Sequence, residues 1–206
     1  DIAHGKLIVN GKVNQPSGTM NLDGGTLDIS GEYIILRQGK NSTTDEFEYQ
    51  YAYAAGLQMS KEADVLNIGG DFYIYGDDGK CTLTAGTLTV KGNFTQKGTD
   101  SYTDGNFKAT GTHKVILAGT GEQRISFDST WSYFQNLSVT EGTVDYGETG
   151  NVILKGTFTN VNGEKALAAQ FTLNVRQKPV LDTLKLEQKD ADATLKNGEN
   201  AYVSEY

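Results

Sequence analysis

A seven-residue pattern of apolar and polar positions recurs five times along the chain. Two aliphatic residues at alternate positions precede a glycine, and Val or an aromatic residue follows the glycine by two positions. The copies are LIVNGKV (7–13), LDISGEY (27–33), LNIGGDF (66–72), LTVKGNF (88–94) and VILKGTF (152–158). Alternate apolar positions place side chains on one face of a strand, and a glycine interrupts that row where the chain can bend. Each copy therefore predicts a strand, a corner and a second strand.

The copies are separated by intervals near 20 residues or near twice that number. From Leu7 to Leu27 is 20 residues, from Leu27 to Leu66 is 39, and from Leu66 to Leu88 is 22. Weaker copies begin at Val115, Leu137 and Leu173. Such intervals are typical of the coils of a solenoid. We attribute the interval of 27 before Val115 to an insertion at 96–106, whereas the interval of 15 between Leu137 and Val152 has no explanation in the sequence.

These patterns predict an all-β fold, a right-handed parallel β-helix or β-solenoid with coils of about 20 residues. In such a stack, each coil pairs in parallel with the coils above and below it, which satisfies the backbone without hairpins. We expect one solenoid domain over residues 1–206, in which 184–206 is a polar capping coil or the start of another module. The alternative is a β-sandwich of ordinary hairpins, which also has short strands and frequent turns.

Charge and composition narrow the range of partners. The net charge is −8, with an isoelectric point near 4.8, and an acidic surface repels nucleic acid. No stretch approaches the 18 or so apolar residues of a transmembrane helix, so we expect no membrane insertion. Cys81 is the only cysteine and excludes an internal disulfide. The first residues do not form a signal peptide and indicate a boundary within a longer chain.

One acidic cluster is a weak candidate for a metal site. Asp71, Asp77 and Asp78 surround a glycine-containing stretch and could hold calcium. Their spacing matches neither an EF-hand loop nor a calcium-binding nonapeptide repeat, and Asp-Asp-Gly is also a common turn. The same three carboxylates with Lys80 are the only candidates for the acidic and basic residues of a β-helix polysaccharide lyase.

Two aromatic stretches are candidates for ligand binding. Tyr49 and Tyr51 belong to a row with Phe47 and Tyr53 that shares one face of a strand, either as an exposed platform for sugars or as core. The second stretch contains the only tryptophan, Trp131, together with Tyr133 and Phe134. An exposed Trp131 could stack on a sugar ring, and a buried one would fill a coil corner.

No catalytic residues can be assigned from the sequence. His4 lies near the N-terminus and His113 lies at a predicted strand start, and neither has a nucleophile or metal-ligand partner at an interpretable spacing. We therefore expect no enzymatic activity and no cofactor.

Three stretches resemble, in order and spacing, a repeat region of very large secreted or surface proteins of Gram-positive anaerobic bacteria. They are GLQMSKEADVLNIGGDFY (56–73), LTAGTLTVKGNFTQ (83–96) and the stretch 106–139. The resemblance covers about residues 56–160 and implies a stacked β fold and an extracellular or cell-surface location. It implies no biochemical activity and no binding residues.

Two hypotheses for function follow. The first is a non-catalytic structural or adhesive module of a bacterial surface or secreted protein, which contacts a polysaccharide or a surface protein. The second is a carbohydrate-binding or polysaccharide-lyase-like domain of a carbohydrate-active enzyme. The exposure of Trp131 and of the aromatic row discriminates between them, because a groove lined by these residues and two carboxylates would favour the second.

Overall fold

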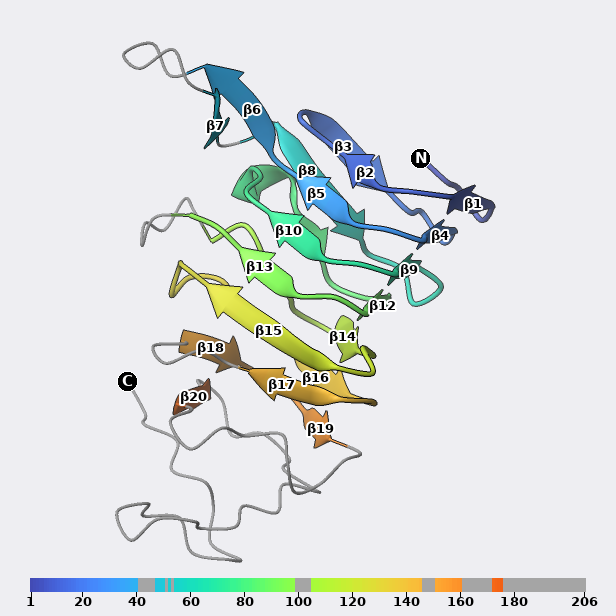
Figure 1. The fold of residues 1–206 in the computed structure, drawn as a ribbon. Helices are drawn as coiled ribbons and strands as arrows, with labels where there is room; N and C mark the ends of the chain where they lie inside the picture. The colour runs from blue at the N-terminus through green and yellow to red at the C-terminus, as the bar shows by residue number, and fades with distance from the viewer. Residues whose placement is uncertain are drawn as a thin grey trace, which may run out of the picture.

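The fold is all-β and is built from parallel sheets of short, stacked strands (Figure 1). The computed structural model describes residues 1–40, 47–50, 52, 54–98, 105–145, 151–160 and 172–175. Residues 184–206, for which we expect a capping coil or another module, lie outside the described residues. Neighbouring strands of the large sheets are distant in sequence, so the hairpin pairing of a β-sandwich is not what these strands form.

The first sheet contains the strands that open the first four copies of the repeated pattern and the weaker copies at Val115 and Leu137, and its last strand follows the glycine of the copy at 152–158. Its order is β1 (Lys6–Val9), β4 (Thr26–Ile29), β9 (Val65–Ile68), β12 (Thr87–Val90), β14 (Lys114–Leu117), β16 (Asn136–Val139) and β19 (Phe158–Asn160). Every pair is parallel, and from β1 to β16 the register aligns the first aliphatic positions, as in Leu27 with Leu66 and Leu66 with Leu88.

The second sheet contains the strands that follow the corner glycine. Its order is β17 (Thr143–Asp145), β15 (Glu122–Phe127), β13 (Phe94–Gln96), β10 (Phe72–Ile74), β5 (Tyr33–Ile35) and β2 (Val13–Asn14). Tyr33, Phe72 and Phe94 are register partners. Both strands of each of the first four copies are thereby confirmed, one in each sheet.

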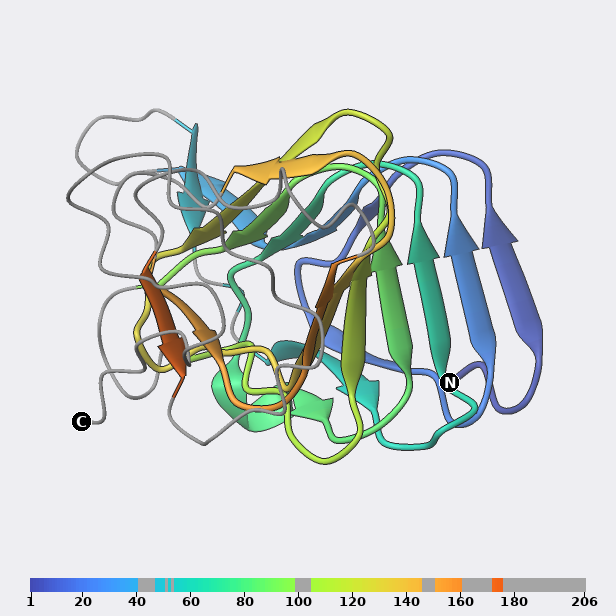
Figure 2. The same ribbon diagram turned by 90° about the horizontal axis from the view of Figure 1, so that it is seen from below.

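A third row of strands forms the third side of the stack. In sequence, these strands come after a strand of the second sheet and before the next strand of the first sheet. It begins with the parallel strands β3 (Gly18–Asn21), β8 (Ala55–Met59) and β11 (Thr82–Leu83). Parallel bridges from Leu83 to Ala109, from Lys108 to Tyr133 and from Phe134 to Leu154 continue the row. It ends with the parallel pair β18 (Asn151–Leu154) and β20 (Thr172–Val175). Figure 2 shows the chain passing along all three sides in turn.

In the described part of the chain, a pair of antiparallel strands and a 3₁₀ turn depart from the stacked strands. The strands β6 (Arg37–Lys40) and β7 (Phe47–Gln50) pair with each other in antiparallel register between β5 and β8. A single 3₁₀ turn, η1 (Asp78–Lys80), follows β10. Among the described residues, no helix has the length and apolar character needed to cross a bilayer.

The corner between the first two sheets requires glycine because neighbouring coils approach closely there. The amide of Gly92 donates to the carbonyl of Gly70 at 2.9 Å, and Gly70 donates to Gly31 at 3.0 Å. A Cβ added to Gly92 would lie 2.5 Å from both the backbone nitrogen of Asp71 and the carbonyl carbon of Gly70. The glycine of the repeated pattern therefore permits the stacking of successive corners.

The core is one continuous cluster of buried hydrophobic side chains contributed by the three rows of strands. Leu27, Leu66 and Leu88 are fully buried on the first sheet. On the second sheet the rings of Phe72 and Phe94 pack with centroids 5.1 Å apart. The hydroxyl group of buried Tyr33 donates to the side chain of Gln15, so this polar group has a partner in the core.

The repeated pattern leads us to expect Leu7 and Val152 to be buried on the same sheet as Leu27, Leu66 and Leu88, and both expectations are wrong. Val152 is buried, but it lies in β18 on the third side, where it pairs with Leu173, and the first-sheet partner of Leu137 is Phe158. The copy at 152–158 thus spans a different corner, which explains the interval of 15. Leu7 is in register but 46% exposed, because β1 is the terminal strand of the sheet.

The interval of 39 residues is a single step along the first sheet. Strand β4 pairs directly with β9, and the β6–β7 pair lies between them in sequence. Strand β12 likewise pairs directly with β14, as expected for an insertion in the interval of 27. Insertions therefore lengthen the connections and leave the register of the stack unchanged.

Candidate binding site at the Trp131 turn

Trp131 lies at a tight turn between β15 and the third side. The amide of Ser132 donates to the carbonyl of Ser129 at 3.2 Å, and the amide of Trp131 donates to Ser129 Oγ at 3.2 Å. Ser129 and Ser132 are buried, whereas Trp131 is 38% exposed. The Trp131 side chain at the tip of this turn is therefore presented outward, while the serines that begin and end the turn are buried.

The two serines attach the turn to the preceding coil. The amide of Ser129 donates to Gln96 Oε1 at 3.0 Å. The hydroxyl of Ser132 accepts from the amide of Phe107 at 3.3 Å, and the next residue, Tyr133, donates its amide to the Phe107 carbonyl at 2.8 Å. Contacts on both sides of Trp131 thus restrict the conformations of the turn.

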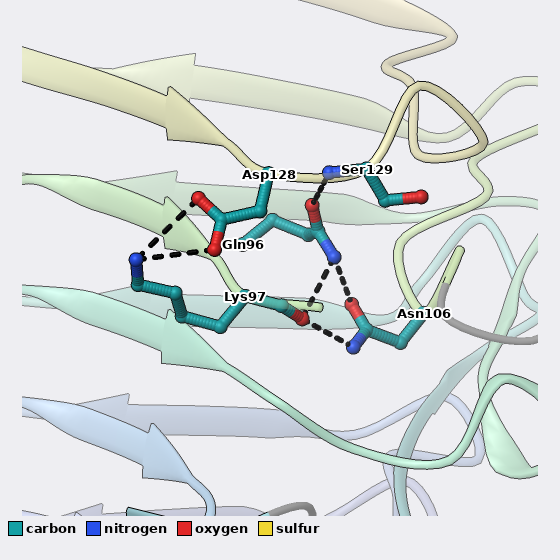
Figure 3. A network of polar contacts seen from close by, with 5 residues as sticks. All are labelled: Gln96, Lys97, Asn106, Asp128 and Ser129. Carbon is teal, nitrogen blue, oxygen red and sulfur yellow. Dashed lines mark hydrogen bonds and ion pairs between the residues drawn. The ribbon is translucent and has the colours of Figure 1, made fainter. Parts of the chain in front are cut away.

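Buried amide side chains support this attachment (Figure 3). Gln96 and Asn106 are both fully buried. Gln96 Nε2 donates to the carbonyl of Lys97 at 2.8 Å and to Asn106 Oδ1 at 3.1 Å, and Asn106 Nδ2 donates to the same carbonyl at 2.9 Å. Because each polar group has a partner, the network holds the two loop bases together without the penalty of unpaired buried groups.

Two ion pairs border the turn. Lys97 Nζ lies 3.1 Å from Asp128 Oδ2, next to Ser129. Lys108 Nζ lies 2.6 Å from Asp78 Oδ2, and the exposed fractions of these side chains are only 24% and 25%. A Cβ added to Gly105 would contact both Lys108 Cε and Trp131 Cβ. The Lys108 side chain therefore passes close to the base of the Trp131 side chain.

One face of the Tyr133 ring is covered by a lysine side chain. Lys155 Nζ lies 3.3 Å from the centroid of its ring, a cation–π contact. Tyr133 is half-buried on the outward side of the third row, next to Lys108 in register. Of the two aromatic residues expected at this site, Trp131 is the one with a large exposed surface.

The turn rests on a cluster of aromatic rings. Phe107 and Phe134 are fully buried, with ring centroids 5.7 Å apart. Phe127 packs against Phe134 at 4.9 Å, and Phe94 packs against Phe107 at 4.9 Å. Edge-to-face packing of this kind adds about 0.5–1.5 kcal/mol per pair to the area burial. The base of the site is accordingly part of the core.

The other aromatic stretch cannot be placed as a ligand platform. The backbone of Tyr49 lies in β7, opposite Gln38. Tyr51 and Tyr53 lie outside the described residues, and so do the side chains of Phe47 and Tyr49.

The three candidate metal ligands do not converge. Asp71 lies before β10 and accepts from the amide of Asn93 at 2.6 Å. Asp77 and Asp78 lie after β10: Asp77 accepts from the amide of Gly79 at 2.9 Å and begins η1, and Asp78 pairs with Lys108. Within the part of the chain that the structure describes, no three His, Cys, Asp or Glu side chains are arranged to hold a metal ion.

Burial shifts the pKa of half-buried Cys81 and of fully buried His113. Burial raises the pKa of the Cys81 thiol to about 12, so the reactive thiolate is scarce at neutral pH. Burial lowers the pKa of His113 to about 4, so its imidazole is neutral.

Several residues of the site have no signal in the sequence. Gln96 ends β13, Asn106 and Ser129 lie in loops, and their hydrogen-bond partners are up to 33 positions away. Comparison with protein-family models, curated proteins and solved structures finds no match to the chain.

Proposed function

We propose that the chain is a non-catalytic structural and adhesive module that presents Trp131 to a polysaccharide or a surface protein. Its scaffold would be a right-handed parallel β-helix with coils of about 20 residues. The three rows of register-aligned parallel strands support this scaffold, and nearly all crossovers between parallel strands are right-handed.

The observation that carries the proposal is the exposed Trp131 on a turn held by buried polar contacts. Exposed aromatic side chains on rigid supports bind ligands with little loss of conformational entropy. One aromatic contact contributes about 1 kcal/mol, so a single module would bind weakly. Useful adhesion would then require many copies on one long chain.

The expected location is the cell surface or the extracellular medium of a bacterium. This part of the proposal rests on the resemblance of residues 56–160 to a repeat region of large secreted proteins of Gram-positive anaerobes. In such a protein, stacked coils would form a rigid spacer as well as a binding surface.

A lyase-like or carbohydrate-binding domain of an enzyme is the second candidate. The observation that favours it is the half-buried Lys108–Asp78 pair beside Trp131, which places a base and an acid next to a possible sugar platform. Incubation with a panel of neutral and uronate-containing polysaccharides, followed by measurement of released reducing sugar, separates the two. Release of sugar that is lost in Lys108→Ala would support the enzyme and overturn the non-catalytic proposal.

The binding proposal is tested by a glycan array and a polysaccharide pull-down with the module displayed in many copies on beads. We expect Trp131→Ala to weaken binding at each module by about fivefold, as the loss of about 1 kcal/mol requires. The matched control is Ile8→Ala, which removes an exposed apolar side chain, 60% exposed, on the terminal strand β1. Equal binding by wild type and Trp131→Ala would refute the role of the turn.

A further inference from the structure

His113 is a buried side chain without hydrogen bonds. It is fully buried, and neither ring nitrogen has a partner among the described residues. Buried polar groups normally have partners, so the exception calls for an explanation. The backbone around it is fixed, because the amide of Asn136 donates to the His113 carbonyl at 3.2 Å and the amide of His113 donates to Thr110 at 3.2 Å.

The imidazole ring packs against the ring that supports the Trp131 turn. The ring centroids of His113 and Phe107 are 5.9 Å apart in an edge-to-face arrangement. Phe107 donates its amide to Ser132 Oγ, and its carbonyl accepts from the amide of Tyr133. Ser132 and Tyr133 follow Trp131 directly in the sequence. His113, Phe107 and the turn therefore form an unbroken series of contacts.

We propose that His113 is an acid-sensitive latch: when its imidazole is protonated, Phe107 loses its packing and the Trp131 turn opens. The cause is the cost of placing a charged imidazolium, with two N–H donors and no acceptor, against an aromatic ring in the core. The latch does not depend on what the turn binds, because it concerns only the conformation of the turn.

The direction of the pH effect follows from the burial of His113. Its pKa is about 4 in the closed state, against an ordinary value of 6.5 when the ring reaches water. Between pH 4 and pH 6.5, the His113 imidazole is protonated in the open state and neutral in the closed state. Below pH 6.5 the equilibrium constant for opening should therefore rise up to tenfold for each unit of pH, until about pH 4.

The charged groups around His113 do not remove this effect. The negative charge of buried Asp64 acts on the ring and opposes the lowering of the His113 pKa, but the effect of burial is larger. The Asp64 carboxylate already accepts three backbone amides, from Gly24, Ser60 and Lys61, at 2.5, 2.7 and 2.9 Å. The other charged residues of the adjoining segments are exposed or half-buried; they are Lys61, Glu62, Lys108 and Lys114.

The single tryptophan makes the latch directly measurable. Quenching of Trp131 fluorescence by acrylamide is followed from pH 7.5 to 4, with far-ultraviolet circular dichroism to confirm that the sheets persist. We expect quenching of the wild type to increase with a midpoint between pH 6.5 and 4, and His113→Phe to show no such increase. The matched control is His4→Phe, which replaces the other histidine of the chain. His4 is exposed, so this variant should behave as the wild type does.

A wild-type measurement keeps the test decisive if His113→Phe and His113→Leu fail to fold. Hydrogen exchange, corrected for the intrinsic effect of pH, is measured in two groups of residues. The first group is the turn and its support, residues 105–109 and 129–134, and the second group is the strands β9 and β12. We expect opening to increase on acidification in the first group only. A quenching transition that persists in folded His113→Phe, or equal increases in exchange in both groups, would overturn the latch.

Discussion

At the scale of single residues, the repeated pattern specifies which side chains point inward, but the extent of burial also depends on the place of the strand in the sheet. Leu88 and Leu7 occupy the same column of the first sheet, but Leu88 is fully buried and Leu7 is 46% exposed. The alternation of apolar residues predicted which side chains point inward. It could not indicate that β1 is the terminal strand, because end exposure depends on the neighbour and not on the strand itself.

The difference between these two leucines predicts unequal costs of truncation. Leu88→Ala should lower the free energy of unfolding by about 2–5 kcal/mol, because it removes buried methyl groups and leaves a cavity. Leu7→Ala should cost clearly less, because its side chain already contacts solvent. Denaturant melts of both variants measure the costs, and equal losses would contradict the placement of Leu7 at the end of the sheet.

The corner glycines predict a second pair of unequal effects. Gly92→Ala should lower the free energy of unfolding by about 1–3 kcal/mol, the usual range for overpacking, since the new Cβ would meet the backbone of Gly70 and Asp71. At Gly121 an added Cβ meets nothing within 4 Å, so Gly121→Ala should be neutral or slightly stabilising. Thermal unfolding of both proteins tests this, and a neutral Gly92→Ala would show that the coils do not approach closely there.

At the scale of elements, the sequence predicted strands and corners but not which side of the stack each occupies. The pattern at 152–158 has the same form as that at 88–94, yet it joins β18 to β19, whereas the other joins β12 to β13. A strand–glycine–strand unit fits any corner between two sides. The position of a copy therefore depends on the length of the preceding connections, which propensity and periodicity do not determine.

The loops that form the candidate site were even less predictable than the strands. Trp131 and Tyr133 were identified by their residue type, but Gln96 and Asn106 hold the loop bases through partners that only the coil stacking brings near. The amide network depends on tertiary contacts, and no spacing along the chain encodes it.

This dependence makes Gln96 a test of how the loops are held. Gln96→Leu would leave the backbone amide of Ser129 and the side-chain oxygen Oδ1 of Asn106 without their Gln96 partner, and each buried unsatisfied group costs about 1–3 kcal/mol. We expect lower stability and faster hydrogen exchange at residues 105–109 and 129–133. Gln58→Leu, on the half-exposed outward row of β8, is the control. Unchanged exchange in Gln96→Leu would show that the network does not hold the turn.

At the scale of the whole molecule, separation in space should follow the number of strands and not the number of residues. Insertions such as β6–β7 lengthen the chain between two coils without moving them apart in the first sheet. This property lets loops vary while the core remains continuous, and it is what allows one coil to present Trp131 on an otherwise regular scaffold.

The most direct test of the stacked parallel arrangement is a pair of spin-label distances in solution. Labels at Ile8 and Ile116 are separated by four strand spacings of the first sheet, and labels at Ile8 and Thr159 by six. With Cys81 replaced by Ser and a spacing of about 4.8 Å, the backbone separations should be about 19 and 29 Å. Double electron–electron resonance should therefore give a second distance about 10 Å longer than the first. Equal distances, or a shorter second distance, would contradict the parallel stack.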